Sequence, residues 1–89
     1  MSRYFFDVKL DDQASVDEDG LEFDTDRDAE QQALLALGDI AREFIRSGDM
    51  RASVAIEVRD DRGPVLTATI QLSVKHARSP ATQSPTGPR

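Results

Sequence analysis

The chain has 89 residues, no cysteine or tryptophan, a single histidine and a formal net charge of −6. This length fits one small domain, because single domains usually contain about 100–150 residues. The lack of cysteine excludes a disulfide framework, a thiol nucleophile and cysteine-ligated zinc or iron–sulfur clusters. Residues 1–61 hold all 17 acidic side chains and seven basic ones, whereas residues 62–89 hold four basic side chains and no acid. An acidic surface repels a phosphate backbone, so nucleic acid is not expected as the main partner.

The N-terminal half begins with a strand pattern. Apolar and polar residues alternate from Tyr4 to Leu10, which predicts a half-buried β-strand with Phe5, Asp7 and Lys9 on its open face. We expect Asp7 and Lys9 to form a solvated ion pair there. A turn at Asp11-Asp12 precedes a short second strand over residues 13–17.

One helix is predicted between two capping signals. Thr25 is the expected N-cap, accepting from the backbone N–H of Asp28, and Gly48 is the expected left-handed C-cap. Leu21 and Phe23 lead into this helix. Its predicted apolar stripe consists of Ala33, Leu34, Leu37, Ile40, Ala41, Phe44 and Ile45. Leu35 lies about 160° from Leu37 on a helical wheel, outside the stripe.

The C-terminal half contains a β-hairpin and a tail. Two alternating runs within residues 53–74, separated by residues 60–63, predict antiparallel strands. Residues 75–89 are rich in small and polar residues and proline, so we expect a disordered tail. Residues 1–74 are expected to form one α+β domain. Its architecture would be a two-layer sandwich, with a mainly antiparallel sheet of about three to four strands covered on one face by the long helix.

An acidic loop suggests calcium as one candidate ligand. The segment from Asp11 to Glu30 holds ten acids and one base, and residues 15–26 approach the spacing of an EF-hand loop. The candidate ligands are Asp17, Asp19 and Asp26. Position one is serine, position twelve is an aspartate, and a strand precedes the loop instead of a helix. A solvated loop followed by an acidic first helical turn explains the same residues, so no metal or other cofactor is expected.

Catalytic constellations are weak in this chain. His76, the single histidine, falls where the last strand gives way to the tail. A catalytic histidine needs a fixed nucleophile beside it, so an exposed residue is the better interpretation. Asp7 lies on an open face rather than in the apolar pocket that a general acid requires. The five glycines are scattered and form no phosphate-binding loop. We therefore expect a protein that is not an enzyme.

Large apolar side chains on faces expected to be exposed indicate interaction instead. Phe5 heads the open face of the sheet, next to Asp7, and Leu35 lies on the solvent side of the helix. The hairpin also leaves at least one edge strand free to pair. A small domain with a limited core gains stability by oligomerisation, so we expect a homodimer through the open face or that edge.

The signature Arg3-Tyr4-Phe5-Phe6, the acidic segment 17–22, an Ala- and Leu-rich helix and residues 58–63 form a recognisable set. Together they resemble a family of small uncharacterised bacterial proteins that open with Arg-Tyr-Phe-Phe. The resemblance spans roughly residues 3–72 and implies a single domain of unknown function. Members of that family often carry histidine at the place of Asp7, so any role of that histidine is in doubt in this chain.

A weaker likeness connects the chain to HicB-type antitoxin domains, which combine a sheet, an acidic turn and one amphipathic helix. Those domains commonly have three strands before the helix and often a DNA-binding segment, and neither is predicted from this sequence. The likeness rests on fold-level analogy.

Function is therefore expected at the level of a class. We expect a non-enzymatic protein-interaction or regulatory domain, homodimeric and binding a protein partner, with toxin neutralisation as one specific form. Calcium binding by the acidic loop is the competing hypothesis. No stretch approaches the roughly 20 apolar residues that span a bilayer, and the start lacks the apolar run of a signal peptide. The expected location is therefore the cytoplasm, without membrane contact.

Overall fold

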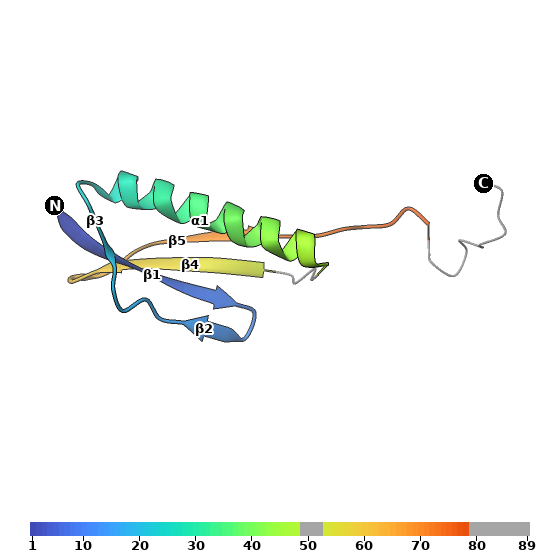
Figure 1. Ribbon diagram of the computed structural model, residues 1–89, viewed down its shortest axis with the longest axis horizontal. Helices are drawn as coiled ribbons and strands as arrows, with labels where there is room; N and C mark the ends of the chain where they lie inside the picture. The colour runs from blue at the N-terminus through green and yellow to red at the C-terminus, as the bar shows by residue number, and fades with distance from the viewer. Residues whose placement is uncertain (49–52, 79–89) are drawn as a thin grey trace.

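A computed structural model describes residues 1–48 and 53–78 of the chain (Figure 1). Five strands form an antiparallel sheet in the order β2-β1-β4-β5, with β3 also paired to β1. One helix lies on one face of this sheet, which confirms the predicted two-layer α+β fold. The elements are β1 (Ser2–Leu10), β2 (Gln13–Ser15), β3 (Leu21–Phe23), α1 (Asp26–Ser47), β4 (Ser53–Asp60) and β5 (Gly63–Gln71).

Two short strands share the outer edge of β1. β2 pairs with the end of β1 through Val8↔Ser15 and Leu10↔Gln13. β3 pairs with the beginning of β1 through Ser2↔Phe23 and Tyr4↔Leu21. The sequence predicted residues 21–23 as a lead into the helix, and in the structure they form a strand along the beginning of β1, which β2 does not reach.

Both predicted helix caps are present. The Thr25 hydroxyl accepts from the Asp28 N–H at 3.1 Å, and Gly48 adopts the left-handed conformation with φ 81°. Each cap provides a partner for backbone groups that the helix leaves free. The helix therefore begins and ends where the sequence predicted.

The core is centred on a line of small helical side chains. Its buried residues are Tyr4, Ala29, Ala33, Leu37, Val54, Ile56 and Val58. The alanines allow the helix backbone to approach the sheet closely, so the line of contact follows Ala29, Ala33, Leu37 and Ala41. Leu34 and Ile45 lie to one side of this line and are more than half exposed. Their assignment to the buried stripe was wrong.

The hairpin of β4 and β5 is confirmed, with a two-residue turn at Asp61-Arg62. A bulge shifts the register between Val58 and Arg59. Gln71 pairs with Ser53, the first residue of β4, so the ladder ends there and not at Val74 as expected. Residues 72–78 form neither helix nor strand, and the rest of the predicted tail, residues 79–89, lies outside the described residues.

Candidate interaction surfaces

The open face of the sheet carries an ion pair between two central strands. Arg59 on β4 donates from Nε to Asp7 Oδ2 at 2.8 Å and from a terminal nitrogen to Asp7 Oδ1 at 3.4 Å. The register places Phe5 directly opposite Arg59, and the guanidinium carbon lies 4.6 Å from the Phe5 ring centroid. This geometry combines a two-point salt bridge with a cation–π contact.

The same cluster fixes residues 16–20, which connect β2 and β3 and are called the anchor loop below. Arg59 donates to the Asp17 carbonyl at 3.0 Å, and the Asp17 N–H donates to Asp7 Oδ1 at 2.9 Å. The Asp17 carboxylate accepts the N–H of Phe6 on β1 and the N–H groups of Asp19 and Gly20 in its own loop. Phe6 is the middle one of the three β1 residues between the parts covered by β3 and β2, so Asp17 completes the edge.

Gly20 makes this close approach possible. Its φ is 73°, and a Cβ added there would lie 2.9 Å from the Tyr4 carbonyl oxygen and 2.9 Å from Arg3 Cγ. Arg3 contributes from the β1 side by donating to the Asp19 carbonyl at 2.8 Å. Only glycine combines the left-handed backbone with this lack of space.

The charges of the cluster support one another. The Arg59 guanidinium lowers the pKa of Asp7 below its usual value, against the opposing effect of burial. Burial also acts to raise the pKa of Asp17, but the N–H donors of Phe6, Gly20 and Asp19 outweigh it, so the net shift is downward. The hydrogen bond that Arg59 donates to Asp7 in turn raises the pKa of Arg59. All three side chains are therefore held in their charged forms.

This arrangement fastens the loop to the sheet. Both oxygens of Asp7 and both oxygens of Asp17 accept hydrogen bonds.

A depression of about 220 Å³ lies beside the ion pair, lined by Asp7, Glu57, Val58, Arg59, Pro64, Leu66 and Thr67. A carboxylate with a lowered pKa is a poor proton donor at neutral pH, so the cluster is unsuited to general acid catalysis.

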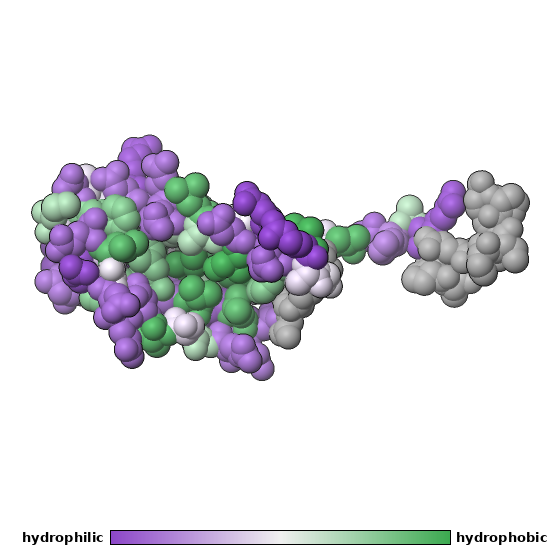
Figure 2. All heavy atoms as spheres, viewed as in Figure 1, coloured by the Kyte–Doolittle hydropathy of each residue, from purple (hydrophilic) through white to green (hydrophobic). Residues whose placement is uncertain are grey.

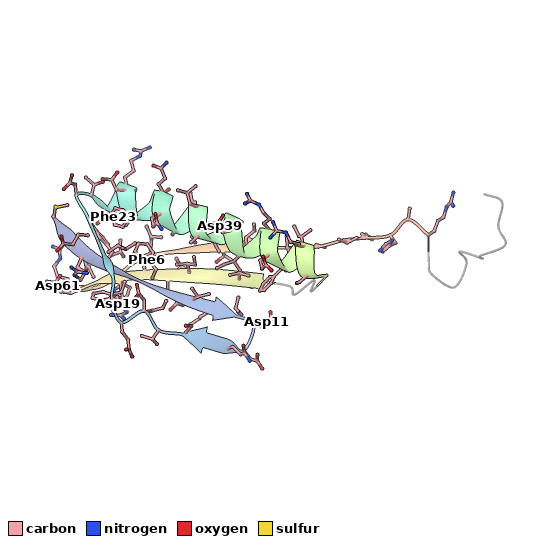
Figure 3. All side chains as sticks on the ribbon, in the orientation of Figure 1. Phe6, Asp11, Asp19, Phe23, Asp39 and Asp61 are labelled. Carbon is pink, nitrogen blue, oxygen red and sulfur yellow. The ribbon has the colours of Figure 1, made fainter. Side chains whose placement is uncertain are left out.

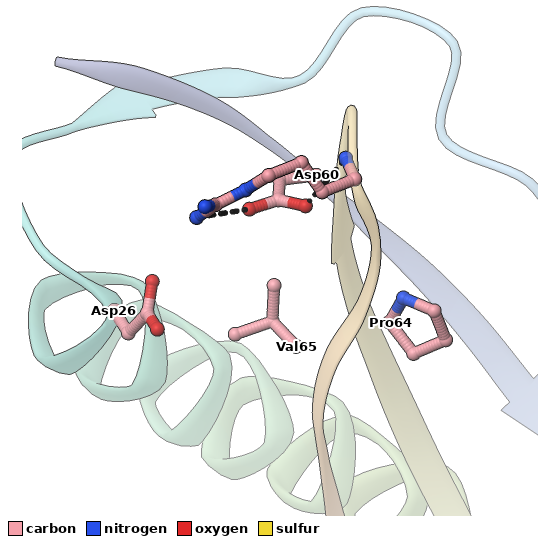
Figure 4. A pocket seen from close by; sticks show the side chains of 5 residues that line it. Asp26, Asp60, Pro64 and Val65 are labelled. Atoms are coloured by element: carbon pink, nitrogen blue, oxygen red, sulfur yellow. Dashed lines mark hydrogen bonds and ion pairs between the residues drawn. The ribbon is translucent and has the colours of Figure 1, made fainter.

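A second polar cluster lies where the helix begins. Tyr4 is 3% exposed, and its hydroxyl donates to Asp26 Oδ1 at 2.7 Å. That hydrogen bond raises the pKa of Tyr4 from 10.0 to about 12. Asp26 and Val65 line a pocket of about 350 Å³ together with Pro64 and the contact between Asp60 and Arg62 (Figure 4).

The three residues predicted to form an interaction surface lie on two different faces. Phe5 and Asp7 are on the open face of the sheet, where both contact Arg59. Leu35 is on α1, which packs on the other face, and is 60% exposed. Asp7 pairs with Arg59 and not with Lys9, whose Nζ instead lies 3.1 Å from Glu57 Oε2. The expected Asp7–Lys9 pair was wrong because the cross-strand register brings other partners closer.

The three candidate calcium ligands do not converge. The Asp17 carboxylate accepts hydrogen bonds from backbone N–H groups, and Asp26, at the start of the helix, accepts a hydrogen bond from the Tyr4 hydroxyl. Asp19 is exposed on the anchor loop (Figure 3). Within residues 1–48 and 53–78, no group of three or more acidic or histidine side chains is arranged to hold a metal ion. His76 is exposed in the segment after β5.

β5 forms the edge of the sheet opposite to β2. A two-residue turn makes Asp60 and Gly63 a hydrogen-bonded pair, and N–H and C=O groups alternate in direction along a strand. The partners of Leu66, Ala68 and Ile70 on β4 lie an even number of residues from Asp60, so these three residues direct their backbone groups toward β4. The backbone groups of Thr67, Thr69 and Gln71, which alternate with them, therefore point outward. The same alternation directs the Phe6 N–H away from β4, where Asp17 accepts it.

The sequence predicted that the hairpin leaves an edge strand free to pair, but it did not indicate that Arg59 contacts Phe5, Asp7 and the anchor loop. The composition of β5 contains a usable signal, because residues 63–74 include no charged side chain in a chain that is 31% charged. The role of Arg59 has no such signal. It depends on the register between β1 and β4, which joins residues about fifty positions apart in the chain.

The fold and these surfaces define a small α+β domain with one helix on an antiparallel sheet and an acidic loop fastened to one sheet edge. The family described as a domain of unknown function, DUF6894, matches residues 3–71, so the chain belongs to this family. This confirms the predicted membership of an uncharacterised family. No match to the chain was found among the curated proteins or among the solved structures.

Proposed function

We propose that this domain is a non-enzymatic protein-interaction module that self-associates by strand pairing at the β5 edge. The supporting observation is the edge itself. β5 has nine residues, carries no charge and directs the backbone groups of Thr67, Thr69 and Gln71 away from the sheet. Exposed edge strands without charges readily pair with another strand.

Proteins usually protect a sheet edge with charged residues, bulges or short strands. Here only the beginning of β5 has such protection, from Pro64 and the adjacent bulge. From Leu66 to Gln71 the strand is regular and antiparallel to β4. A second copy that pairs along this stretch in antiparallel orientation generates a symmetric dimer with a continuous sheet.

The Asp7–Asp17–Arg59 cluster supports an interaction role over an enzymatic one. Its carboxylates are paired and their pKa values are lowered, whereas a general acid needs a raised pKa.

Within the described residues, no helix has the length and apolar character needed to cross a membrane. A toxin-neutralising role and a cytoplasmic location stay predictions within this proposal.

The proposal is tested by removing one outward N–H group from each edge. In Thr69→Pro the lost N–H points away from β4, so the internal ladder is kept. Ala14→Pro is the matched control. Ala14 lies opposite Lys9, between the hydrogen-bonded pairs Val8↔Ser15 and Leu10↔Gln13, so its N–H points outward from the opposite edge. We expect Thr69→Pro to weaken self-association in analytical ultracentrifugation by at least about tenfold, and Ala14→Pro to leave it unchanged.

Amide hydrogen exchange gives an independent readout on the unmodified chain. Exchange at Thr67, Thr69 and Gln71 should slow as the protein concentration rises, since pairing buries these N–H groups. Exchange at Ala14 should not change. If Thr67, Thr69 and Gln71 exchange at the same rate at all concentrations, the β5 edge is not an interface.

A further inference from the structure

A groove runs along β1 on the helix side of the sheet. It has a volume of about 400 Å³ and is lined by Phe6, Val8, Ser15, Val16, Asp17, Glu18 and Asp19. Figure 2 shows apolar side chains gathered on this face beside the helix. We call this feature the β1 groove.

The groove exists because the helix is displaced toward the other half of the sheet. α1 packs mainly on β4 and β5 and touches β3 at its beginning. The inward-facing side chains of β1 therefore remain only half-buried at Phe6, Val8 and Leu10. Val16 is 63% exposed at the same place, which extends the apolar surface onto the anchor loop. Apolar side chains that are exposed together in this way mark a binding site on many soluble proteins.

The rim of the groove is acidic. Glu18 and Asp19 are exposed on the anchor loop, and Figure 3 shows Asp19 on this loop next to β1. The surrounding segment from Asp11 to Glu30 holds ten acids and one base. Exposed apolar side chains beside a negative rim favour a segment that alternates apolar side chains with polar ones and carries positive charge.

The chain itself contains such a segment directly after β5. Residues 72–78, here called the C-terminal arm, continue past the end of the sheet and project away from the body of the domain (Figure 1). Leu72 and Val74 are separated by Ser73, so in an extended chain they point to the same side. Val74 is 64% exposed, and Lys75 follows it with positive charge.

We propose that the β1 groove receives the C-terminal arm of a second copy of this chain. Leu72 and Val74 would cover Phe6, Val8 and Val16, while Lys75 would approach the acidic rim. The arm leaves its own domain beyond Gln71 and points outward, so it is presented to another molecule. The opposite charges of groove and arm follow the charge distribution of the chain, in which all acids lie within residues 1–61 and residues 62–89 carry basic side chains and no acid. This inference does not depend on pairing at the β5 edge.

Two charge reversals test the exchange of arms. Glu18→Lys changes the groove, and Lys75→Glu changes the arm; both side chains are exposed, so neither variant should disturb the fold. Each reversal should weaken self-association by about tenfold, because an attractive contact becomes repulsive. Asp61→Lys, an equal reversal at the exposed β4–β5 turn, is the matched control and should have no effect. The series is measured in the Thr69→Pro chain, so that any pairing at the β5 edge does not contribute.

Mixing the two variants distinguishes exchange from self-folding. A mixed dimer contains one unchanged arm in an unchanged groove and one pair with both charges reversed, so both contacts are attractive. The mixture should therefore associate within about threefold of the parent chain, although each variant alone does not. If the arm folded back into its own groove, each variant would still have a repulsive contact within its own chain, and mixing the two variants would not restore association.

The apolar part of the contact has its own variant. Val74→Ser removes an exposed methyl pair from the arm and should weaken association several-fold without changing the thermal stability of the monomer. Association that is unaffected by Val74→Ser, or mixing that gives no recovery, overturns the proposal. Loss of β5 pairing alone leaves these results unchanged, so the two proposals fail separately.

Discussion

β1 and β5 lie on either side of β4, and they differ in what covers the edge that faces away from β4. β1 and β5 each have nine residues, and each pairs directly with β4 on one side. The free edge of β1 is covered along its length by β3, by the Asp17 carboxylate and by β2. The free edge of β5 has no partner strand among residues 1–48 and 53–78. Within these residues, the domain therefore closes one edge with its own chain and leaves the other accessible.

The two edges differ in the charged residues that they contain. On the closed side, three charged residues, Asp7, Asp17 and Arg59, hold a loop against the strand. On the open side, the chain has no charged side chain from Gly63 to Val74. Charged side chains in an edge strand commonly prevent pairing, and β5 carries none. This absence is what the proposed pairing at the β5 edge rests on.

Gly20→Ala should produce the largest effect on the closed edge. The new Cβ would meet the Tyr4 carbonyl oxygen, and the backbone would keep an unfavourable positive φ. We expect a loss of about 3 kcal/mol in the free energy of unfolding, measured by urea denaturation. Gly48→Ala is the control with positive φ but open space around it, and it should cost less. Equal losses for both variants would show that the close approach at Gly20 is unimportant.

Asp17→Ala should have the next largest effect. It leaves the N–H groups of Phe6, Asp19 and Gly20 without their acceptor, and loss of a comparable capping side chain costs about 1–2 kcal/mol. The free edge of β1 should then become accessible, with faster amide exchange at Phe6. Glu18→Ala, in the same loop and exposed, should leave both stability and exchange unchanged.

Acid should open the same edge without a mutation. The pKa values of Asp7 and Asp17 are lowered in the folded chain relative to the ordinary value of 3.8. Their stabilising contribution is therefore complete above pH about 5 and is lost as the pH falls through 3.8 and below. Thermal unfolding between pH 6 and 3, as approximate limits, should show this loss, and Asp17→Ala should reduce it. A pH-independent melting temperature in this range would contradict the ion-pair geometry.

Tyr4 provides the smallest and most selective test. It is the only tyrosine, so its ionisation is visible by ultraviolet absorbance without interference. The hydrogen bond to Asp26 should place its titration at a pKa of about 12 instead of 10.0. The unfolded chain loses this proton first, so stability should fall between pH 10 and 12. Asp26→Asn should shift the titration back toward 10, and an unchanged midpoint would argue against the hydrogen bond.

Local patterns predicted most of the secondary structure. The alternation in residues 4–10 and 53–71 and the caps at Thr25 and Gly48 depend on neighbours in the chain, and the structure contains all of them. β3 was missed because three residues carry too little periodicity to indicate a strand. The exposure of Leu34 and Ile45 was missed because the tilt of the helix follows from how closely the alanines approach the sheet.

The candidate surfaces were harder to predict for the same physical reason. Phe5 and Asp7 were identified as unusual open-face residues, but their shared partner Arg59 is brought to them only by the strand register. The acidic loop was noticed for its charge, and its carboxylate turned out to bind the backbone of a neighbouring strand. The alternation of residues and the local charge identified these residues as candidates, whereas the pairing of distant strands determines what they contact.

The order in which the closed edge forms has a consequence for synthesis on the ribosome. β1, β2, the anchor loop and β3 are contiguous within the first 23 residues, whereas β4, the inner partner of β1, is made about thirty residues later. The outer side of β1 can therefore be covered while the nascent chain still lacks β4. A growing chain exposes unpaired strands that tend to aggregate with one another. Early closure by the anchor loop leaves the emerging polypeptide with one reactive strand side instead of two.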